Sequence, residues 1–427
     1  MPTLKPQSGR VRGFLRRRSA FSKRLLLLAI SLCVGLLICE AGLRVLGLGV
    51  PPGLLYEFDE QCGMRLSPDF AGWQVNEGRV YVTTNAHGMR DTAVTKQKDP
   101  DVFRIAVLGD SYAEAVQVEI EQTFWSVAET QLNACQAAGP RHVECLNFGV
   151  SGYGTAQELI TLRQRVWDFQ PDMILLAFLP YNDVRNNSKQ LEPETYRPFY
   201  ELRDDELVLD RSAMLSADGP RRFHNSAWIR GKHFLIQHIR LCGLVYQWRD
   251  ARRRAAAQTA AEQAATEQAG NSPDVEVGLD AAVYLPPAGP WEQAWEVTDR
   301  LIVEMQREAA AHRAAFAVMA VTAAVQVDPD PSQAIELAER LGVDDLKYPE
   351  RRLQALGQQH GFPVILLTDR MQADAEAEQI YFHGFENTAL GSGHWNVAGH
   401  HKAGQLLAEE LCDQGLSNPV SPRPPNP

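Results

Sequence analysis

The chain of 427 residues is poor in cysteine and lacks the short motifs that mark common metal sites. It has seven cysteines, and two of them, Cys33 and Cys39, fall in an apolar segment near the N-terminus. No C-x-x-C pair and no H-E-x-x-H motif occurs, so a zinc site has little support. We therefore expect neither a metal nor another cofactor.

Positive charge is scarce outside the N-terminal end of the chain. Eight of the 42 Lys and Arg residues lie within the first 24 positions, where no acidic residue occurs. The rest of the chain therefore carries 34 basic residues against 53 acidic ones. A body this acidic lacks the excess of basic residues that binds nucleic acid, and we expect no nucleic-acid partner.

One long apolar run follows the basic end. Residues 25–39 are apolar apart from Ser31, and the run extends to Leu43 if Glu40 sits at the outer interface. That length is close to the ~20 residues that cross a bilayer. The basic flank then predicts a single-pass anchor in the inner (cytoplasmic) membrane, with the N-terminus in the cytoplasm. A cleaved secretory signal is the alternative, since Cys39-Glu40-Ala41 loosely fits a cleavage site. Both alternatives export the remainder of the chain to the periplasm.

Five cysteines remain in the exported part of the chain. Cys135 and Cys145 flank residues 136–144, between a predicted helix end and a predicted strand. A disulfide between them is geometrically reasonable in an oxidising compartment. Two buried free thiols are the alternative.

From Val102 onward the hydrophobic pattern alternates between strands and helices. It predicts strands at 103–108, 142–148, 173–178, 314–321 and 363–368, and helices at 121–135, 155–169, 291–312, 349–360 and 396–411. Such alternation implies right-handed crossovers and a parallel sheet. Five strands of this kind predict a three-layer α/β/α sandwich.

The same pattern predicts how the chain is divided. We expect a basic cytoplasmic tail at 1–24, an anchor at 25–48, a lead-in segment at 49–101, the main domain at 102–415 and a disordered tail at 416–427. The alternation fails between 186 and 290, which is too long for an ordinary loop. Within this insertion, residues 233–248 fit an amphipathic helix that covers the site as a lid or simply packs, and residues 249–275 are of low complexity.

Gly109-Asp110-Ser111 comes directly off the first predicted strand of the main domain. It places a serine hydroxyl where a strand ends and a helix begins, which is where α/β proteins hold their chemistry. The serine could equally be a helix N-cap. No G-x-S-x-G surrounds it, which argues against a nucleophile elbow.

Three further blocks follow in order: Asn-Phe-Gly-Val-Ser-Gly at 147–152, Tyr-Asn-Asp at 181–183 and His-Trp-Asn-Val-Ala-Gly-His at 394–400. Together with the Gly-Asp-Ser block they resemble the SGNH/GDSL hydrolase superfamily, over residues 102–411. The Asn…Gly-x-Arg-Asp stretch at 85–91 is similar to one that precedes the catalytic domain in membrane-anchored members. The resemblance implies the flavodoxin-like SGNH-hydrolase fold and serine esterase chemistry.

The resemblance implies Ser111 as the nucleophile and His394 as the general base. An imidazole that titrates near neutral pH suits this task. His394 lies just before a helix whose predicted N-cap is Asn396. His400 and His401 are the alternatives, but they fall a turn or more into that helix.

Three donors are expected for the oxyanion: the backbone N–H groups of Ser111 and Gly152 and the side-chain amide of Asn182. Each such donor contributes roughly 3 kcal/mol of transition-state stabilisation. Gly149 is a second candidate for the role of Gly152, and a plain tight turn is the alternative reading. Pro180 stands where the family has a glycine. For structural support of the turns we expect two further residues, Asp110 and Asn147.

The orienting acid is missing from its family position. The family has an aspartate two or three residues before the histidine, where this chain has Ser392 and Gly391. Replacing the acid of a related triad costs on the order of 10⁴ in rate. The acid could come from Asp369 or Glu386, or the site could be a Ser-His dyad, or the activity could be weak.

The function expected from these residues is an extracytoplasmic esterase that removes an acyl group, most simply acetyl, from a carbohydrate or similar ester. A cell-envelope polysaccharide O-acetyltransferase uses the same Ser-His chemistry and is the second hypothesis. A non-catalytic glycan-binding envelope protein on the same fold is the third. The expected partners are the acylated substrate and the membrane.

Overall fold

A computed structural model describes residues 8–46, 55–192, 196–216, 227–246, 248–249, 252, 274–276 and 279–416. Nearly all of the predicted low-complexity segment 249–275 and all but the first residue of the predicted tail 416–427 lie outside the described residues. The chain divides into two compact units. The first comprises 1–52 and 227–259, and the second comprises 53–226 and 260–427.

The first unit is helical in its described part. Helix α1 (Ser8–Val45) contains a stretch, Leu26–Val45, that is long and apolar enough to cross a membrane, and an N-terminal signal sequence has the same character. Helix α8 (Ala227–His238) is followed by a second helical stretch at 240–246. The amphipathic helix predicted at 233–248 is therefore present, but it begins earlier and is broken at Ile239.

The second unit is built on a five-stranded sheet in which every neighbouring pair is parallel. The strand order is β13-β12-β7-β5-β6. The strands are β5 (Val102–Gly109), β6 (His142–Asn147), β7 (Met173–Phe178), β12 (Ala315–Ala320) and β13 (Val364–Leu366). All residues of β7 are buried, as expected for a parallel strand that is covered on both faces. The five predicted strands are confirmed.

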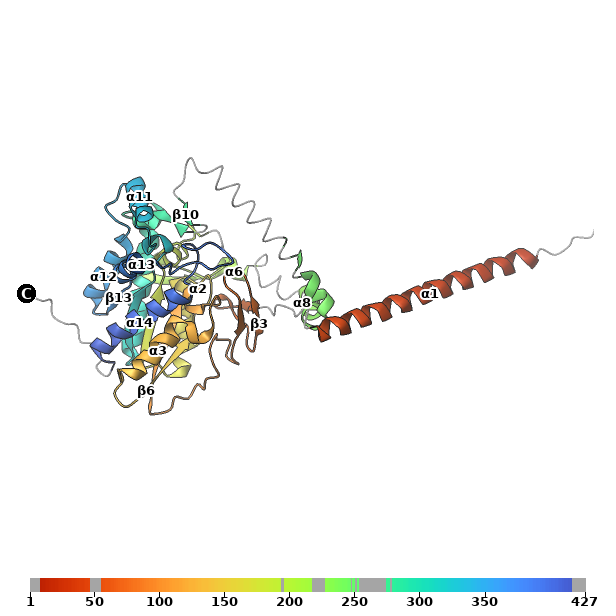
Figure 1. Cartoon of the computed structure of the whole chain (residues 1–427), viewed down its shortest axis with the longest axis horizontal. Helices are drawn as coiled ribbons and strands as arrows, with labels where there is room; N and C mark the ends of the chain where they lie inside the picture. The colour runs from red at the N-terminus through yellow and green to blue at the C-terminus, as the bar shows by residue number, and fades with distance from the viewer. Residues whose placement is uncertain are drawn as a thin grey trace, which may run out of the picture. The chain divides into compact units, whose positions relative to one another are not determined.

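Helices cover both faces of this sheet. Helices α3 (Phe124–Ala134) and α14 (Val397–Gln414) pack side by side on one face (Figure 1). Helices α4 (Thr155–Gln164) and α10 (Pro290–Ala311) pack together against β5 and β12 on the other. The predicted three-layer sandwich is confirmed.

The remaining helices are short or lie at the rim. They are α2 (Ser111–Glu114), α5 (Pro180–Arg185), α6 (Ser212–Leu215), α11 (Ser332–Leu341), α12 (Tyr348–His360), α13 (Thr368–Glu378) and the 3-10 turns Ile120–Gln122, Val166–Phe169, Ala281–Tyr284 and Ala324–Gln326. The sequence pattern predicted α12 but neither α11 nor α13.

The disulfide joins different cysteines from those expected. Cys135 at the end of α3 bonds to Cys412 in α14, and Cys145 is a buried free thiol in β6. The predicted Cys135–Cys145 bridge is wrong because the two helices lie side by side, which brings together cysteines 277 positions apart.

Antiparallel hairpins surround the sandwich. The lead-in forms two, β1 (Tyr56–Asp59) with β2 (Gly63–Leu66) and β3 (Ala71–Gln74) with β4 (Val80–Thr83). The insertion adds β8 (Phe199–Arg203) with β9 (Glu206–Asp210), and β10 (Asp274–Glu276) with β11 (Leu279–Asp280). The hairpins of the insertion were not predicted.

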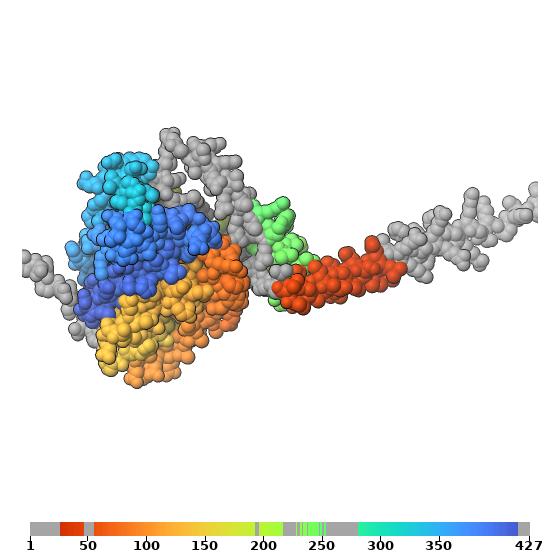
Figure 2. Space-filling view, in the orientation of Figure 1, coloured from red at the N-terminus to blue at the C-terminus, as the bar shows by residue number. Residues whose placement is uncertain are grey.

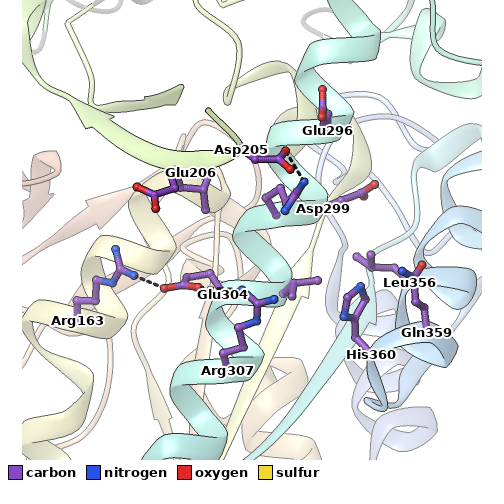
Figure 3. Close-up of a pocket in the computed structure, with 13 residues that line it drawn as sticks. Arg163, Asp205, Glu206, Glu296, Asp299, Glu304, Arg307, Leu356, Gln359 and His360 are labelled. Atoms are coloured by element: carbon purple, nitrogen blue, oxygen red, sulfur yellow. Dashed lines mark hydrogen bonds and ion pairs between the residues drawn. The ribbon is translucent and has the colours of Figure 1, made fainter. Parts of the chain in front are cut away.

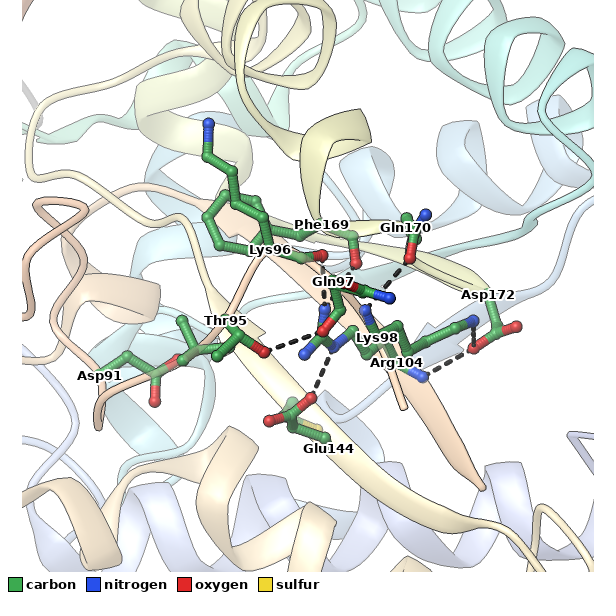
Figure 4. Close-up of polar contacts among 12 residues, drawn as sticks. Asp91, Thr95, Lys96, Gln97, Lys98, Arg104, Glu144, Phe169, Gln170 and Asp172 are labelled. Atoms are coloured by element: carbon green, nitrogen blue, oxygen red, sulfur yellow. Dashed lines mark hydrogen bonds and ion pairs between the residues drawn. The ribbon is translucent and has the colours of Figure 1, made fainter. Parts of the chain in front are cut away.

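Polar contacts fix the end of the lead-in to the sheet (Figure 4). The Arg104 guanidinium, buried in β5, donates to the carbonyl oxygens of Lys96 at 3.1 Å and Phe169 at 2.9 Å. It also pairs with Glu144 of the neighbouring strand at 2.6 Å. The lead-in is thus fastened to the same strands that carry the candidate site.

Candidate active site

The candidate nucleophile lies at the carboxyl end of β5. Ser111 is the first residue of α2, and the side chain of Asp110 caps this helix by accepting from the Tyr112 N–H at 3.0 Å. A Cβ on Gly109 would lie 2.9 Å from the Ala177 carbonyl oxygen, so only glycine lets the strand end so close to β7. Asp110 therefore braces the turn that presents the serine.

The candidate base meets this serine directly. Nε2 of His394 lies 2.8 Å from Oγ of Ser111, although the two residues are 283 positions apart. His394 is in the loop before α14, whose N-cap Asn396 accepts from the Gly399 N–H at 3.0 Å. The structure thus brings together the serine and the histidine that the sequence singled out.

The carboxylate behind the imidazole comes from the lead-in. Oε2 of Glu77 lies 2.5 Å from Nδ1 of His394 and also accepts the His394 backbone N–H at 3.4 Å. Glu77 occupies the turn between β3 and β4. The expected candidates lie elsewhere, since Asp369 pairs with Lys347 and Glu386 is exposed. Sequence reasoning missed Glu77, whose only local signal is a turn-forming Asn-Glu-Gly.

The charge on Glu77 fits an orienting role. Burial alone would raise the pKa of this carboxyl, but the hydrogen bond and charge of His394 outweigh it, so its pKa is lowered. An ionised carboxylate at Nδ1 keeps a proton on that nitrogen. Nε2 is then free to accept the proton of Ser111. The three side chains form a complete Ser-His-Glu relay.

The turn that carries Glu77 is clamped by the loop before the histidine. The Asn387 amide donates to the carbonyls of Val75 and Gly78, both at 3.1 Å, and accepts the Gly78 N–H at 2.8 Å. Gly393 has φ +83°, and a Cβ there would lie 2.4 Å from Oε1 of Glu77. Figure 2 shows the orange lead-in against the blue C-terminal segment.

Buried aromatic and imidazole groups hold the histidine loop. The Gly393 carbonyl accepts from the Tyr112 hydroxyl at 3.2 Å and from Nδ1 of His383 at 2.8 Å. Burial lowers the pKa of His383 to about 4, so this imidazole is neutral at pH 7. The Tyr112 ring also lies 5.1 Å from the ring of His394.

His400 has a structural role in this arrangement. It is fully buried, its ring stacks on Phe124, and its Nδ1 accepts the Phe124 backbone N–H at 3.3 Å. Burial lowers the pKa of His400 to about 3. His401 is exposed on the outer side of α14.

The expected oxyanion donors lie just after the carboxyl ends of three neighbouring strands. Ser111 follows β5, Gly152 follows β6, and Asn182 follows β7 within α5. The Asn182 amide nitrogen donates one of its two hydrogens to Asp110 at 3.0 Å, and the second is the one expected to reach the oxyanion. Pro180 begins α5, so the departure from the family glycine still leaves the asparagine beside the nucleophile turn. Strand order reverses between β5 and β7, where open α/β sheets bind their ligands.

The two candidate glycines of the second loop differ in their surroundings. A Cβ on Gly149 would lie 2.5 Å from the Ala113 Cβ, so this glycine lets α2 pack against the loop. Gly152 has φ +77°, and its nearest neighbour would be the Met64 methyl at 3.7 Å. The open position suits Gly152, rather than Gly149, to facing a substrate.

The Asn…Gly-x-Arg-Asp stretch of the lead-in supports the loop after β6 through hydrogen bonds. The Arg90 side chain is buried and donates to the Glu114 carbonyl at 3.1 Å, at the end of α2. Asn147 donates to the Arg90 carbonyl at 3.1 Å and accepts the Gly149 N–H at 2.9 Å, while Asp91 accepts the Asn147 N–H at 2.9 Å. Asn147 thus joins lead-in and loop, in line with the support expected of it.

A second contact from the lead-in fixes the Ser151-Gly152 turn. The buried carboxyl of Glu114 accepts from the Tyr56 hydroxyl of β1 at 2.7 Å and also from the Ser151 N–H. Burial raises the pKa of Glu114. The lead-in therefore supplies the carboxylate at His394 and contacts both the helix that begins at Ser111 and the Ser151-Gly152 turn.

One cleft is lined by none of these residues. It has a volume of about 720 Å³ and is lined by α4, the β8–β9 hairpin, α10 and α12 (Figure 3). Its charged side chains pair with one another, as in Arg163 with Glu304 at 2.9 Å and Arg300 with Asp205 at 2.7 Å. Within the described residues, no group of three His, Cys, Asp or Glu side chains has an arrangement that could hold a metal ion.

Comparison with known proteins finds similar folds only. No family model and no curated protein matches the chain. Among solved structures, the α/β hydrolase LAE5 from the Lake Arreo metagenome is 13% identical, with a TM-score of 0.35 over 74% of this chain and 96% of its own. The lipase/acylhydrolase from Enterococcus faecalis is 13% identical, with a TM-score of 0.35 over 75% of this chain and 99% of its own. A catalytic mutant of Axe2, an acetylxylan esterase from Geobacillus stearothermophilus, is 8% identical, with a TM-score of 0.36 over 74% of this chain and 96% of its own.

Proposed function

We propose that this chain is a serine esterase that acts on O-acyl esters outside the cytoplasm. The observation that carries the proposal is the relay in which Ser111 Oγ, His394 and Glu77 are joined by contacts of 2.8 Å and 2.5 Å. The non-catalytic hypothesis depends on a missing orienting acid, and the contact of the Glu77 carboxylate with Nδ1 of His394 argues against it.

The geometry supports a two-step acyl transfer through the serine. Oγ of Ser111 attacks the ester carbonyl carbon while Nε2 of His394 takes its proton, and the Glu77 carboxylate stabilises the resulting imidazolium. The carbonyl oxygen becomes negative and accepts hydrogen bonds from the N–H groups of Ser111 and Gly152 and from the Asn182 amide. Collapse breaks the ester bond, and the leaving alcohol takes the proton from His394.

The second step returns the free enzyme. Water attacks the acyl carbon of acylated Ser111, with His394 again taking the proton. The acid is released when the bond to Oγ breaks, and Oγ takes the proton back from His394. The His394 side chain is 28% exposed, so solvent can reach the base. This exposure favours hydrolysis over transfer to a sugar hydroxyl. For the substrate we propose an acetyl ester of a carbohydrate, as expected from the resemblance and from export of the chain.

The test combines covalent labelling with turnover. The full chain, purified in detergent, is treated with a fluorophosphonate probe and assayed on a nitrophenyl acetate. We expect labelling and turnover in the wild type and in Ser126→Ala, a serine of α3 outside the site, and neither in Ser111→Ala. Equal labelling of wild type and Ser111→Ala would remove the proposal. An acetylated glycan, with and without an acceptor sugar, then separates hydrolysis from transfer.

A further inference from the structure

Part of the insertion belongs with the N-terminal helix instead of the sheet. Residues 227–259 form one compact unit with residues 1–52, although the chain on both sides of this segment belongs to the main domain. The unit includes α8 and the helical stretch 240–246, and Figure 1 shows α8 beside the C-terminal end of α1. The insertion therefore carries the chain out of the catalytic unit and back to α1.

Two charged side chains of α1 bind the break between these helices. The Glu40 carboxylate accepts the backbone N–H groups of Arg240 at 3.0 Å and Leu241 at 3.2 Å. Arg44 donates to the His238 carbonyl at 2.7 Å and pairs with Glu40 at 2.8 Å. These contacts satisfy the first donors of one helix and a terminal acceptor of the other, groups that otherwise need water or a cap.

The contacts fix the segment at one end of the apolar stretch. Glu40 lies five positions before Val45, where the stretch ends, which is about 8 Å along a helix axis. Helices that lie flat in a bilayer interface sit ~5–10 Å deep. A segment held at Glu40 is therefore at the depth of an interfacial helix if α1 spans the membrane.

The side chains of this segment match an interface. Six of its large apolar side chains are exposed to solvent: Trp228 (80%), Phe234 (58%), Leu235, Leu244, Val245 and Trp248 (56%). Between 227 and 252 the sequence has five basic residues and a single acidic one, in a chain with a net charge of −11. Tryptophan with basic residues is typical of segments that lie between acyl chains and anionic headgroups.

We propose that α1 spans the membrane and that the described residues between 227 and 252 lie on its outer surface, with the exposed apolar side chains among the acyl chains and the basic ones at lipid phosphates. A membrane fits better than a protein partner because the segment is bound at Glu40, which lies within Leu26–Val45, a stretch long and apolar enough to cross a bilayer. The main domain is then tied to the bilayer through its insertion as well as through the lead-in. This inference is independent of the proposed esterase activity.

Depth-dependent quenching of tryptophan tests the proposal. The full chain is reconstituted in vesicles of phosphatidylcholine and phosphatidylglycerol, with and without brominated acyl chains. Emission of Trp228→Phe/Trp248→Phe is subtracted from that of wild type to isolate these two residues. Trp73→Phe is the control, because Trp73 is 51% exposed but lies in β3 of the second unit.

We expect brominated lipid to remove most of the emission of Trp228 and Trp248 and to spare that of Trp73. Aqueous iodide should give the opposite order. If brominated lipid quenches none of the three, or if iodide reaches Trp228 and Trp248 as readily as Trp73, residues 227–252 are in water and the proposal is overturned. Circular dichroism of the variants checks that these exposed Trp→Phe changes leave the fold intact.

Discussion

The edge of the sheet and the lead-in hairpin contribute to the same site in different ways. At the carboxyl ends of the strands, Ser111 and Asn182 follow buried parallel strands. Asp110 joins them indirectly, because its carboxylate accepts from the Asn182 amide and from the Tyr112 N–H next to Ser111, both at 3.0 Å. In the hairpin, Glu77 occupies a turn between two four-residue strands, and the turn is held by Asn387 from the opposite end of the chain. One region is rigid through its core, whereas the other depends on a long-range clamp.

The candidate catalytic residues are therefore not confined to the sandwich. A lead-in that looks like a spacer in sequence supplies the carboxylate at His394 and supports the oxyanion loop through Tyr56 and Arg90. Substitutions at the carboxyl ends of the strands should therefore remove groups that react with the ester. Substitutions in the lead-in should leave those groups in place but disturb the orientation of the His394 imidazole. The following predictions separate these two effects.

The largest loss is expected at the base. His394→Ala removes the group that takes the Ser111 proton, and kcat should fall on the order of 10⁶, as for removal of one member of a serine triad. Stopped-flow or long-time assays on a nitrophenyl acetate measure it. His401→Ala, at an exposed histidine seven positions further along, is the matched control and should retain wild-type kcat. A comparable loss in His401→Ala would exclude the present assignment.

The next largest loss is expected in the lead-in. Glu77→Gln keeps the shape but removes the charge, so kcat should fall on the order of 10⁴ with little change in KM. Asp369→Asn and Glu386→Gln should leave kcat unchanged, and a loss in either variant would assign the orienting role to that residue instead.

The Glu77 carboxyl should also make protein stability depend on pH. Its folded-state pKa is below its ordinary value of 4.5, so its contribution to the free energy of unfolding is present above pH 4.5 and is lost as the pH falls. The stability gap between wild type and Glu77→Gln, from thermal melts, should narrow accordingly.

A smaller loss is expected at the oxyanion. Asn182→Ala removes one of three donors, and kcat should fall about 10²–10³-fold, with fluorophosphonate labelling slowed but not abolished. The same kinetic assay measures the change. Unchanged kcat would mean that Asn182 serves only to hold Asp110.

The sheet edge could be predicted because its signals are local. A buried strand followed by Gly-Asp-Ser, and a histidine just before a helix N-cap, are short patterns, and they fixed Ser111 and His394 at the correct elements. Glu77 could not be found in this way. Its contact with His394 spans 317 positions, and in the sequence one carboxylate in a short turn resembles any other. The Cys135–Cys412 bond escaped for the same reason, since it depends on how α3 and α14 pack.

The smallest effect on activity is expected from that disulfide. Cys135→Ala/Cys412→Ala should lower the free energy of unfolding by about 2–4 kcal/mol, because the unfolded chain is no longer cross-linked. The bond lies at the ends of α3 and α14, outside the lead-in contacts, so kcat at low temperature should stay at the wild-type value. Chemical denaturation and the ester assay measure both. A large loss of kcat without unfolding would show that the sandwich and the site are less independent than described.

A double-mutant cycle tests most directly whether the lead-in acts through the histidine. Glu77→Gln is measured in the wild-type background and in the His394→Ala background. We predict a loss on the order of 10⁴ in the first and no further loss in the second, because a carboxylate that only orients the imidazole has nothing to orient once it is gone. The same factor in both backgrounds would contradict a relay from Glu77 through His394 to Ser111.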